Sequence, residues 1–215
     1  MKPFVITIED LKESVESAER CIKSGKKYGI KVNKFSAFTP KDDPLKFFKE
    51  EGLSPMGFDE DRKYSRNLNC LSAFRSHYSL WKQCVKENVN YLILEHDAVF
   101  KDKLPIIGFG DICNFGAPSY GSFNTPHKLG LNGLTSKLYL PGAHAYAITP
   151  LGARLLINQA KVYARPTDVF INLHAFPDIK EYYPWPVEAV DDFTTIQHEG
   201  GCGAKHRYSE EYKII

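Results

Sequence analysis

A buried strand that ends in charged residues is the feature that most limits what this chain can fold into. Residues 91–100 read YLILEHDAVF, so an apolar run leads directly into Glu95, His96 and Asp97. Continuous apolar runs of this length are typical of strands covered on both faces. In open αβ sheets, ligands bind beyond the carboxyl ends of the strands. The stretch therefore predicts an α/β fold with a polar site where this strand ends.

The segment before this strand predicts an amphipathic helix over residues 71–86. At about 100° per residue, one wide face collects Leu71, Ala73, Phe74, His77, Tyr78, Leu80, Trp81, Cys84 and Val85. His77 lies near the middle of that apolar face. Ser76 falls on the opposite, polar arc, which we expect to face water.

The first third of the chain predicts a parallel strand–helix–strand unit. FVITI at 4–8 is expected to be a strand, 10–28 a helix and KVNKFSAF at 31–38 a second strand. TPKDDP then opens a polar connection that reaches to about Asn67. The expected fold class is a mixed, mostly parallel, Rossmann-like sheet flanked by helices.

The second half contains a long segment without regular periodicity, residues 108–137, in which DICNFG could form a short strand. A connection of this length is typical of a flexible active-site loop. The segment 143–148 predicts another strand, and Thr149 followed by Pro150 predicts the start of a helix. The glycine-rich residues 199–215 are expected to form a tail.

Composition indicates one globular domain over residues 1–215. Hydrophobic residues make up 43% of the chain, and the net charge of +2 gives no sign of a nucleic-acid or membrane partner. No apolar window is long enough to cross a bilayer, and no secretory signal is present. Five scattered cysteines without a CxxC pair favour reduced thiols. We therefore expect a cytoplasmic protein.

The charged strand end suggests a metal site. Because side chains alternate along a strand, we expect Glu95 and Asp97 to share one direction and His96 to point the other way. Two neighbouring carboxylates repel each other unless a cation or a raised pKa relieves them, and Mn²⁺ or Mg²⁺ prefers such oxygen ligands. The alternative is a solvated strand end that binds nothing.

The same region resembles the family 25 glycosyltransferases, the lipooligosaccharide and collagen galactosyltransferase group. The residues that carry the likeness are Cys70, Ser76-His77 and Glu95-His96-Asp97, at spacings similar to the family's Cys, Ser-His and Glu-Asp-Asp. PGAHAYAITPLGARLLI and RPTDVFI resemble later family segments. His96 departs from the family's middle acid. A second departure is EDLKES after the first strand, where the family has Asn-Leu and an arginine-rich stretch.

The resemblance implies a GT-A fold, a nucleotide-sugar donor (UDP-sugar favoured), a divalent metal (Mn or Mg) and inversion at the anomeric carbon. Asp97 is the first choice as metal ligand, and Glu95 would place metal or ribose. His198 is a candidate third ligand, with an ordinary surface histidine as the alternative. Thr7, Ser76 and His77 are candidate donor-binding residues, although His77 could also be a core histidine bonded to backbone.

Asp168 is the candidate catalytic base, because it matches the family's Pro-x-Asp segment. A plain helix cap is the alternative role for this residue. Asp191 and its neighbour Asp192 are the fallback bases.

Three functions are compatible with these features. The first is a metal-dependent sugar transferase whose acceptor hydroxyl belongs to a glycan, a protein side chain or a hydroxylated DNA base. The second is a catalytically inactive relative that still binds a sugar or nucleotide. The third is a metal-dependent phosphoesterase, which would require more clustered Asp and His than the sequence contains.

Overall fold

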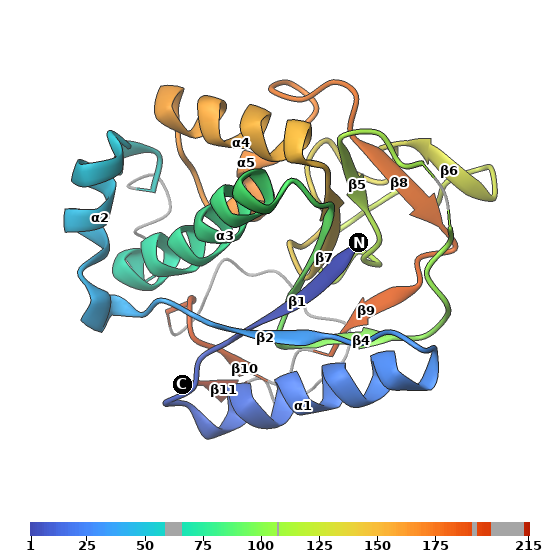
Figure 1. Ribbon diagram of the computed structural model, residues 1–215, viewed down its shortest axis with the longest axis horizontal. Coiled ribbons are helices and arrows are strands. Elements are labelled where there is room, and N and C mark those ends of the chain that lie inside the picture. Colours follow the sequence, from blue (N-terminus) through green and yellow to red (C-terminus); the bar gives the residue numbers. More distant parts are fainter. Residues whose placement is uncertain (59–65, 107, 191–192, 199–212) are drawn as a thin grey trace.

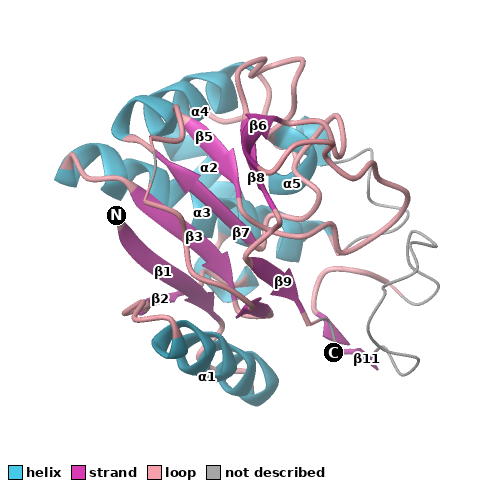
Figure 2. Cartoon of the chain, turned by 90° about the vertical axis from the view of Figure 1, so that its right-hand side faces the viewer, coloured by secondary structure: helices cyan, strands magenta, loops and turns pink. Residues whose placement is uncertain are grey.

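The computed structural model describes residues 1–58, 66–106, 108–190, 193–198 and 213–215. Within them, a seven-stranded mixed sheet lies between helices on both faces (Figure 1, Figure 2). Its strands, in spatial order, are β2 (Asn33–Ser36), β1 (Lys2–Thr7), β3 (Tyr91–Glu95), β7 (Ala145–Ile148), β5 (Ile112–Asn114), β8 (Lys180–Tyr183) and β6 (Gly130–Gly133). The α/β prediction is confirmed.

The directions of the strands divide the sheet into two parts. β1 runs parallel to both β2 and β3, which confirms the predicted parallel unit around α1 (Lys12–Lys27). β7 is antiparallel to β3 and β5, β6 is antiparallel to β8, and only β5 and β8 pair in parallel there. The sheet is therefore more evenly mixed than the sequence suggested. The carboxyl ends of β1, β2 and β3 still meet at one edge, as the site prediction requires.

Side-chain alternation builds a core on each face of the sheet. On one face, Ile6, Tyr91, Ile93, Tyr146 and Ile148 pack with α3 (Asn67–Glu87) and α4 (Pro150–Val162). On the other face, the alternate residues pack with α1: these are Val5, Leu92, Leu94, Ala145 and Ala147. A strand buried on both sides needs a continuous apolar run, and this requirement explains the YLIL sequence of β3.

The remaining elements frame these layers. The short helices are α2 (Pro44–Glu51) and α5 (Thr167–Phe170), with 3₁₀ turns η1 (Pro40–Asp42) and η2 (Met56–Phe58). Two small sheets pair β4 (Ala98–Phe100) with β9 (Val187–Ala189), and β10 (Phe193–Thr194) with β11 (Lys213–Ile214). None of the helices in the described ranges is long and apolar enough to cross a membrane.

Two segments without clear periodicity contain regular elements that the sequence did not reveal. The polar connection at 39–67 carries α2, which begins at Pro44 behind the side-chain cap of Asp43. The segment 108–137 contributes both β5 and β6 to the main sheet. The expected short strand in DICNFG is thus confirmed, whereas β6 was not predicted. With only four residues, β6 is too short to show a period.

The start of α4 follows the predicted capping pattern. Thr149 Oγ1 accepts a hydrogen bond from Gly152 N at 3.0 Å and donates one to Asp111 Oδ1 at 2.8 Å. Gly152 is buried, and a Cβ added there would lie 2.1 Å from the Asp111 carbonyl oxygen. The helix can therefore approach the start of β5 only because this position has no side chain.

We expect Gly152→Ala to destabilise the protein by about 1–3 kcal/mol, because backbone must move to admit the methyl group. Alanine's better helix propensity opposes this loss but does not offset it. Urea denaturation measures the change. Gly133→Ala is the matched control, since an added Cβ there meets nothing within 4 Å. Equal stability of the two variants would contradict the close approach.

Candidate active site

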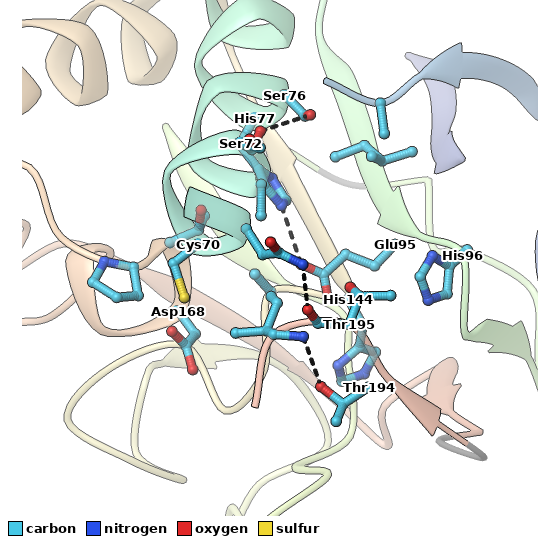
Figure 3. A pocket seen from close by; sticks show the side chains of 18 of the residues that line it. Cys70, Ser72, Ser76, His77, Glu95, His96, His144, Asp168, Thr194 and Thr195 are labelled. Carbon is cyan, nitrogen blue, oxygen red and sulfur yellow. Dashed lines mark hydrogen bonds and ion pairs between the residues drawn. The ribbon is translucent and has the colours of Figure 1, made fainter. Parts of the chain in front are cut away.

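A cavity of about 420 Å³ lies at the carboxyl ends of β1 and β3. Its walls come from the residues after β2, the first turns of α3, the end of β3, the segments 119–120 and 139–144, the start of α5 and the segment 193–197. The titratable residues that line it are Cys70, His77, Glu95, His96, Asp97, Tyr120, Tyr139, His144 and Asp168. Figure 3 labels six of them, all but Asp97, Tyr120 and Tyr139. The predicted strand-end site therefore exists as a concave pocket.

Glu95 and His77 form one wall of this cavity. His77 Nε2 lies 3.1 Å from Glu95 Oε1, although the two residues belong to α3 and β3 (Figure 3). Burial alone would raise the pKa of Glu95. The hydrogen bond from His77 and the nearby imidazoles of His144 and His96 outweigh burial and hold that pKa below its ordinary value. Glu95 is therefore a carboxylate at neutral pH.

The proton on His77 can be located by counting donors and acceptors. Trp81 Nε1, which can only donate, lies 2.8 Å from Tyr146 Oη, so that oxygen accepts. His77 Nδ1 lies 2.9 Å from the same oxygen. Because the Glu95 carboxylate can only accept, His77 Nε2 carries the hydrogen that faces Glu95. Trp81, Tyr146 and His77 are all buried, so these hydrogen bonds fix the orientation of the imidazole.

Asp168 lies on another wall of the cavity, away from Glu95 and His96 (Figure 3). Its Oδ2 accepts a hydrogen bond from Tyr120 Oη at 2.5 Å, and its Oδ1 accepts one from Val169 N at 2.9 Å. The residue thus makes a local bond at the start of α5 and also lines the site. Burial, reinforced by the charge of Glu95, raises the pKa of Asp168, although the bonds from Tyr120 and Val169 oppose this.

The end of β3 follows the expected alternation at His96. Glu95 closes the strand and contacts His77 of α3, whereas His96 contacts Ser14 of α1, on the opposite face of the sheet. The prediction that His96 points away from Glu95 is therefore confirmed. Asp97 follows in the turn and acts on the Cys21 thiol of α1, so the structure does not support the expected shared direction of Glu95 and Asp97. All three residues line the cavity. His96 Nδ1 lies 3.0 Å from Ser14 Oγ, and its ring stacks on Phe193 at 5.1 Å between centroids.

Ser76 is another correction. It is fully buried, because the chain after β2 covers this side of α3. Ser76 Oγ donates to Ser72 O at 3.0 Å and accepts from Phe38 N at 2.9 Å. It lines the cavity without facing bulk water. Its clearest role is to hold the chain after β2 against α3.

The other predicted residues are placed as follows. The cavity is not lined by Thr7, whose hydroxyl donates to Val5 O, or by His198, which is exposed. Asp97 lines the cavity, and both it and Arg20 act electrostatically on the Cys21 thiol, so these two side chains lie in one neighbourhood. Asp191, like Asp192, is outside the described residues.

Sequence reasoning missed several residues that shape the site. Tyr146 and Trp81 read as ordinary core residues, and only the fold shows that their polar atoms reach His77. The 193–197 segment was not expected to cover the cavity. Asn69 Nδ2 donates to Thr195 O at 2.5 Å and so ties that segment to α3 (Figure 3). No local pattern predicts contacts over such separations.

Comparison with known families identifies the chain. The sequence model of glycosyltransferase family 25 (LPS biosynthesis protein) matches residues 1–109, half of the sequence. The chain belongs to glycosyltransferase family 25. It is therefore a glycosyltransferase. A search of curated proteins found no match.

The family match covers only one side of the cavity. It includes β1, β2, α3 and β3, and so His77, Glu95 and Asp97. Tyr120 and Asp168 lie beyond residue 109, so their placement rests on the structure.

Replacing Tyr146 tests the hydrogen-bond assignment at His77. Tyr146→Phe leaves two buried partners unsatisfied, Trp81 Nε1 and His77 Nδ1, so we expect a loss of about 2–4 kcal/mol in unfolding free energy. Tyr28→Phe, which removes one exposed bond to Lys101 O, is the control and should cost less than about 1 kcal/mol. Thermal or urea denaturation distinguishes them. Similar losses would contradict the assignment.

The lowered pKa of Glu95 makes stability depend on pH. Because the folded state favours the carboxylate, Glu95 contributes stability above its ordinary pKa of 4.5, and this is lost as pH falls through the lower folded value. Glu95→Gln should therefore be less stable than the wild type near neutral pH, by about 1 kcal/mol for a partly exposed side chain. The difference should vanish in acid. Denaturation over a pH series measures it, and a constant difference would contradict the prediction.

Proposed function

We propose that this chain transfers a sugar from a nucleotide-sugar donor, with a UDP-sugar favoured, to an acceptor hydroxyl with inversion, and that Asp168 is the general base. The observation that supports this best is a pair of carboxylates in one cavity with pKa values shifted in opposite directions. Environment keeps Glu95 ionised and makes Asp168 the more basic group. Such a split is typical of sites that assign different roles to two acids.

In the proposed reaction, the acceptor oxygen attacks the anomeric carbon as its proton passes to Asp168. A new carbon–oxygen bond forms while the bond from the anomeric carbon to the diphosphate breaks. The nucleoside diphosphate leaves with that electron pair. Direct displacement with a carboxylate base needs no covalent sugar–enzyme intermediate, and it inverts the anomeric configuration.

A divalent ion is part of the proposal. Where Mn²⁺ or Mg²⁺ binds, Asp97 is the first candidate ligand, with Glu95 beside it at the end of β3. Within the described residues no group of three or more His, Cys, Asp or Glu side chains is arranged to hold a metal. The proposed ion would be held by one or two carboxylates and completed by substrate phosphates and water, as is common for Mg²⁺. The ion would offset charge on the departing diphosphate.

A glycan is the acceptor class we favour. The family description names lipopolysaccharide biosynthesis, in which acceptors are sugars. The cavity also carries the rings of Tyr120 and Tyr139 on its walls, and aromatic faces are suited to packing against a sugar ring. The alternative acceptors are a hydroxylated protein side chain and a hydroxylated base, and the same assay would detect transfer to either.

Asp168→Asn tests the proposal directly. With Mn²⁺ and a panel of UDP-, GDP-, CMP- and TDP-sugars, we expect slow hydrolysis of one donor by the wild type. The variant should lose about 10²–10⁴-fold in turnover, because it cannot take the proton. Calorimetric donor binding should be unchanged. Asp178→Asn, an exposed carboxylate outside the cavity, is the matched control and should keep full turnover.

The outcomes separate the competing functions. Full turnover by Asp168→Asn would overturn the assignment of the base. Binding of a donor without turnover, in the presence of sugar acceptors, would favour an inactive relative. Asp97→Asn should weaken Mn²⁺ binding measured by electron paramagnetic resonance in the protein without donor, which tests the ion independently of activity.

A further inference from the structure

On the side of the cavity that carries Asp168, a set of contacts joins residues that all lie after residue 109, where the family match ends. Tyr120 reaches Asp168 across 48 residues of sequence, and its 2.5 Å bond is short, as expected for a hydroxyl that donates to a carboxylate. Both side chains line the cavity. Tyr120 therefore touches the proposed base within the cavity.

Lys137 contacts Tyr120 from outside the cavity. Its Nζ donates to the Tyr120 backbone carbonyl at 2.5 Å and lies 4.0 Å from the centre of the Tyr120 ring. A cation over an aromatic face is attracted to it, and this geometry fixes the ring as well as the backbone. Lys137 is not itself part of the cavity wall. Its contacts act on Tyr120.

The two residues before Lys137 are anchored by a buried carboxylate on β8. Glu181 is fully buried, and its Oε1 accepts bonds from Thr135 N at 2.6 Å, Thr135 Oγ1 at 2.8 Å and Ser136 N at 3.0 Å. Burying a charge is unfavourable unless hydrogen bonds compensate it, and these three bonds provide that compensation. They fix the two residues immediately before Lys137 to the main sheet. A continuous set of contacts thus runs from β8 to Asp168.

We propose that Tyr120, held by Lys137 and the Glu181 anchor, is the positioning residue that orients Asp168 and keeps it ionised for proton abstraction. This inference rests on the proposed function, in which Asp168 is the base. Tyr120 donates to Oδ2, so it leaves the remaining lone pairs of the carboxylate to accept the acceptor's proton. Its hydrogen bond stabilises the ionised form against burial and against the charge of Glu95.

The direction of the pH effect follows from these contacts. Burial and Glu95 raise the pKa of Asp168, and the bond from Tyr120 lowers it. Removing the hydroxyl must therefore raise the pKa further. Because a general base works when ionised, turnover rises as pH passes through the pKa of Asp168, and the variant needs a higher pH to reach its plateau. The other titratable groups around this cavity are Cys70, His77, Glu95, His96, Asp97, Tyr139 and His144, with Lys137 behind Tyr120.

The test combines a titration that needs no substrate with a pH–rate profile. Aspartate labelled at its carboxyl carbon is followed by NMR in the full chain, and the Asp168 signal is identified by its loss in Asp168→Asn. Tyr120→Phe should move the Asp168 midpoint upward by about 1–2 pH units, the size expected for losing a hydrogen bond to a charged group. The rising limb of donor hydrolysis should move with it, and donor KM should stay unchanged.

Two further variants keep the test decisive. Lys137→Met should also move the Asp168 midpoint upward, by a smaller amount than Tyr120→Phe. If circular dichroism shows that Tyr120→Phe does not fold, Lys137→Met takes its place in the test. Tyr28→Phe, which loses a tyrosine hydrogen bond far from the cavity, should leave the midpoint unchanged. An unmoved Asp168 midpoint in folded Tyr120→Phe overturns this inference alone. Full turnover by Asp168→Asn overturns the proposed function instead.

Discussion

The hydrogen bond from His77 to Glu95 is the interaction on which the site depends, because it joins helix α3 to the interior strand β3 where the cavity begins. Strand β3 is covered on both faces and delivers Glu95 to the edge of the sheet. The helix supplies an imidazole that is held in place by Tyr146, which in turn accepts a hydrogen bond from Trp81. In this half of the molecule, the same buried side chains therefore pack in the core and hold the charged groups of the site.

The two carboxylates of the cavity are controlled by separate parts of the fold. Glu95 is held by α3 within the half that matches the family, and its pKa is lowered. Asp168 is held by Tyr120, from a segment that the sheet anchors through Glu181, and its pKa is raised. Each environment is built from different elements, although the charge of Glu95 still contributes to the raised pKa of Asp168. This separation would allow the acceptor side to vary while the strand-end acid is retained.

How far the sequence predicts this structure depends on the range of the pattern involved. Three elements were predicted because residues close together in the sequence specify them. These are the helix before β3, the buried strand itself and the helix that starts at Thr149-Pro150. β6 was missed because its four residues show no period. Ser76 was misplaced because a helical wheel does not show that the Phe38 segment covers that arc. The Tyr120–Asp168 bond was not foreseen, because nothing in either local sequence specifies the other.

The end of β3 shows how far a strand rule reaches. His96 points away from Glu95, towards Ser14 of α1, as alternation predicts, but the next residue, Asp97, lies near Cys21 of the same helix and does not return to the side of Glu95. Alternation is a property of the extended backbone, and β3 loses that backbone after Glu95. The turn brings His96 and Asp97 to the same cavity as Glu95, with His96 held between Ser14 and Phe193. An imidazole placed there adds to the groups that lower the pKa of Glu95. Where the family has a middle acid, this chain has His96. The site therefore carries an imidazole in place of a third carboxylate, and this imidazole favours the ionised form of Glu95.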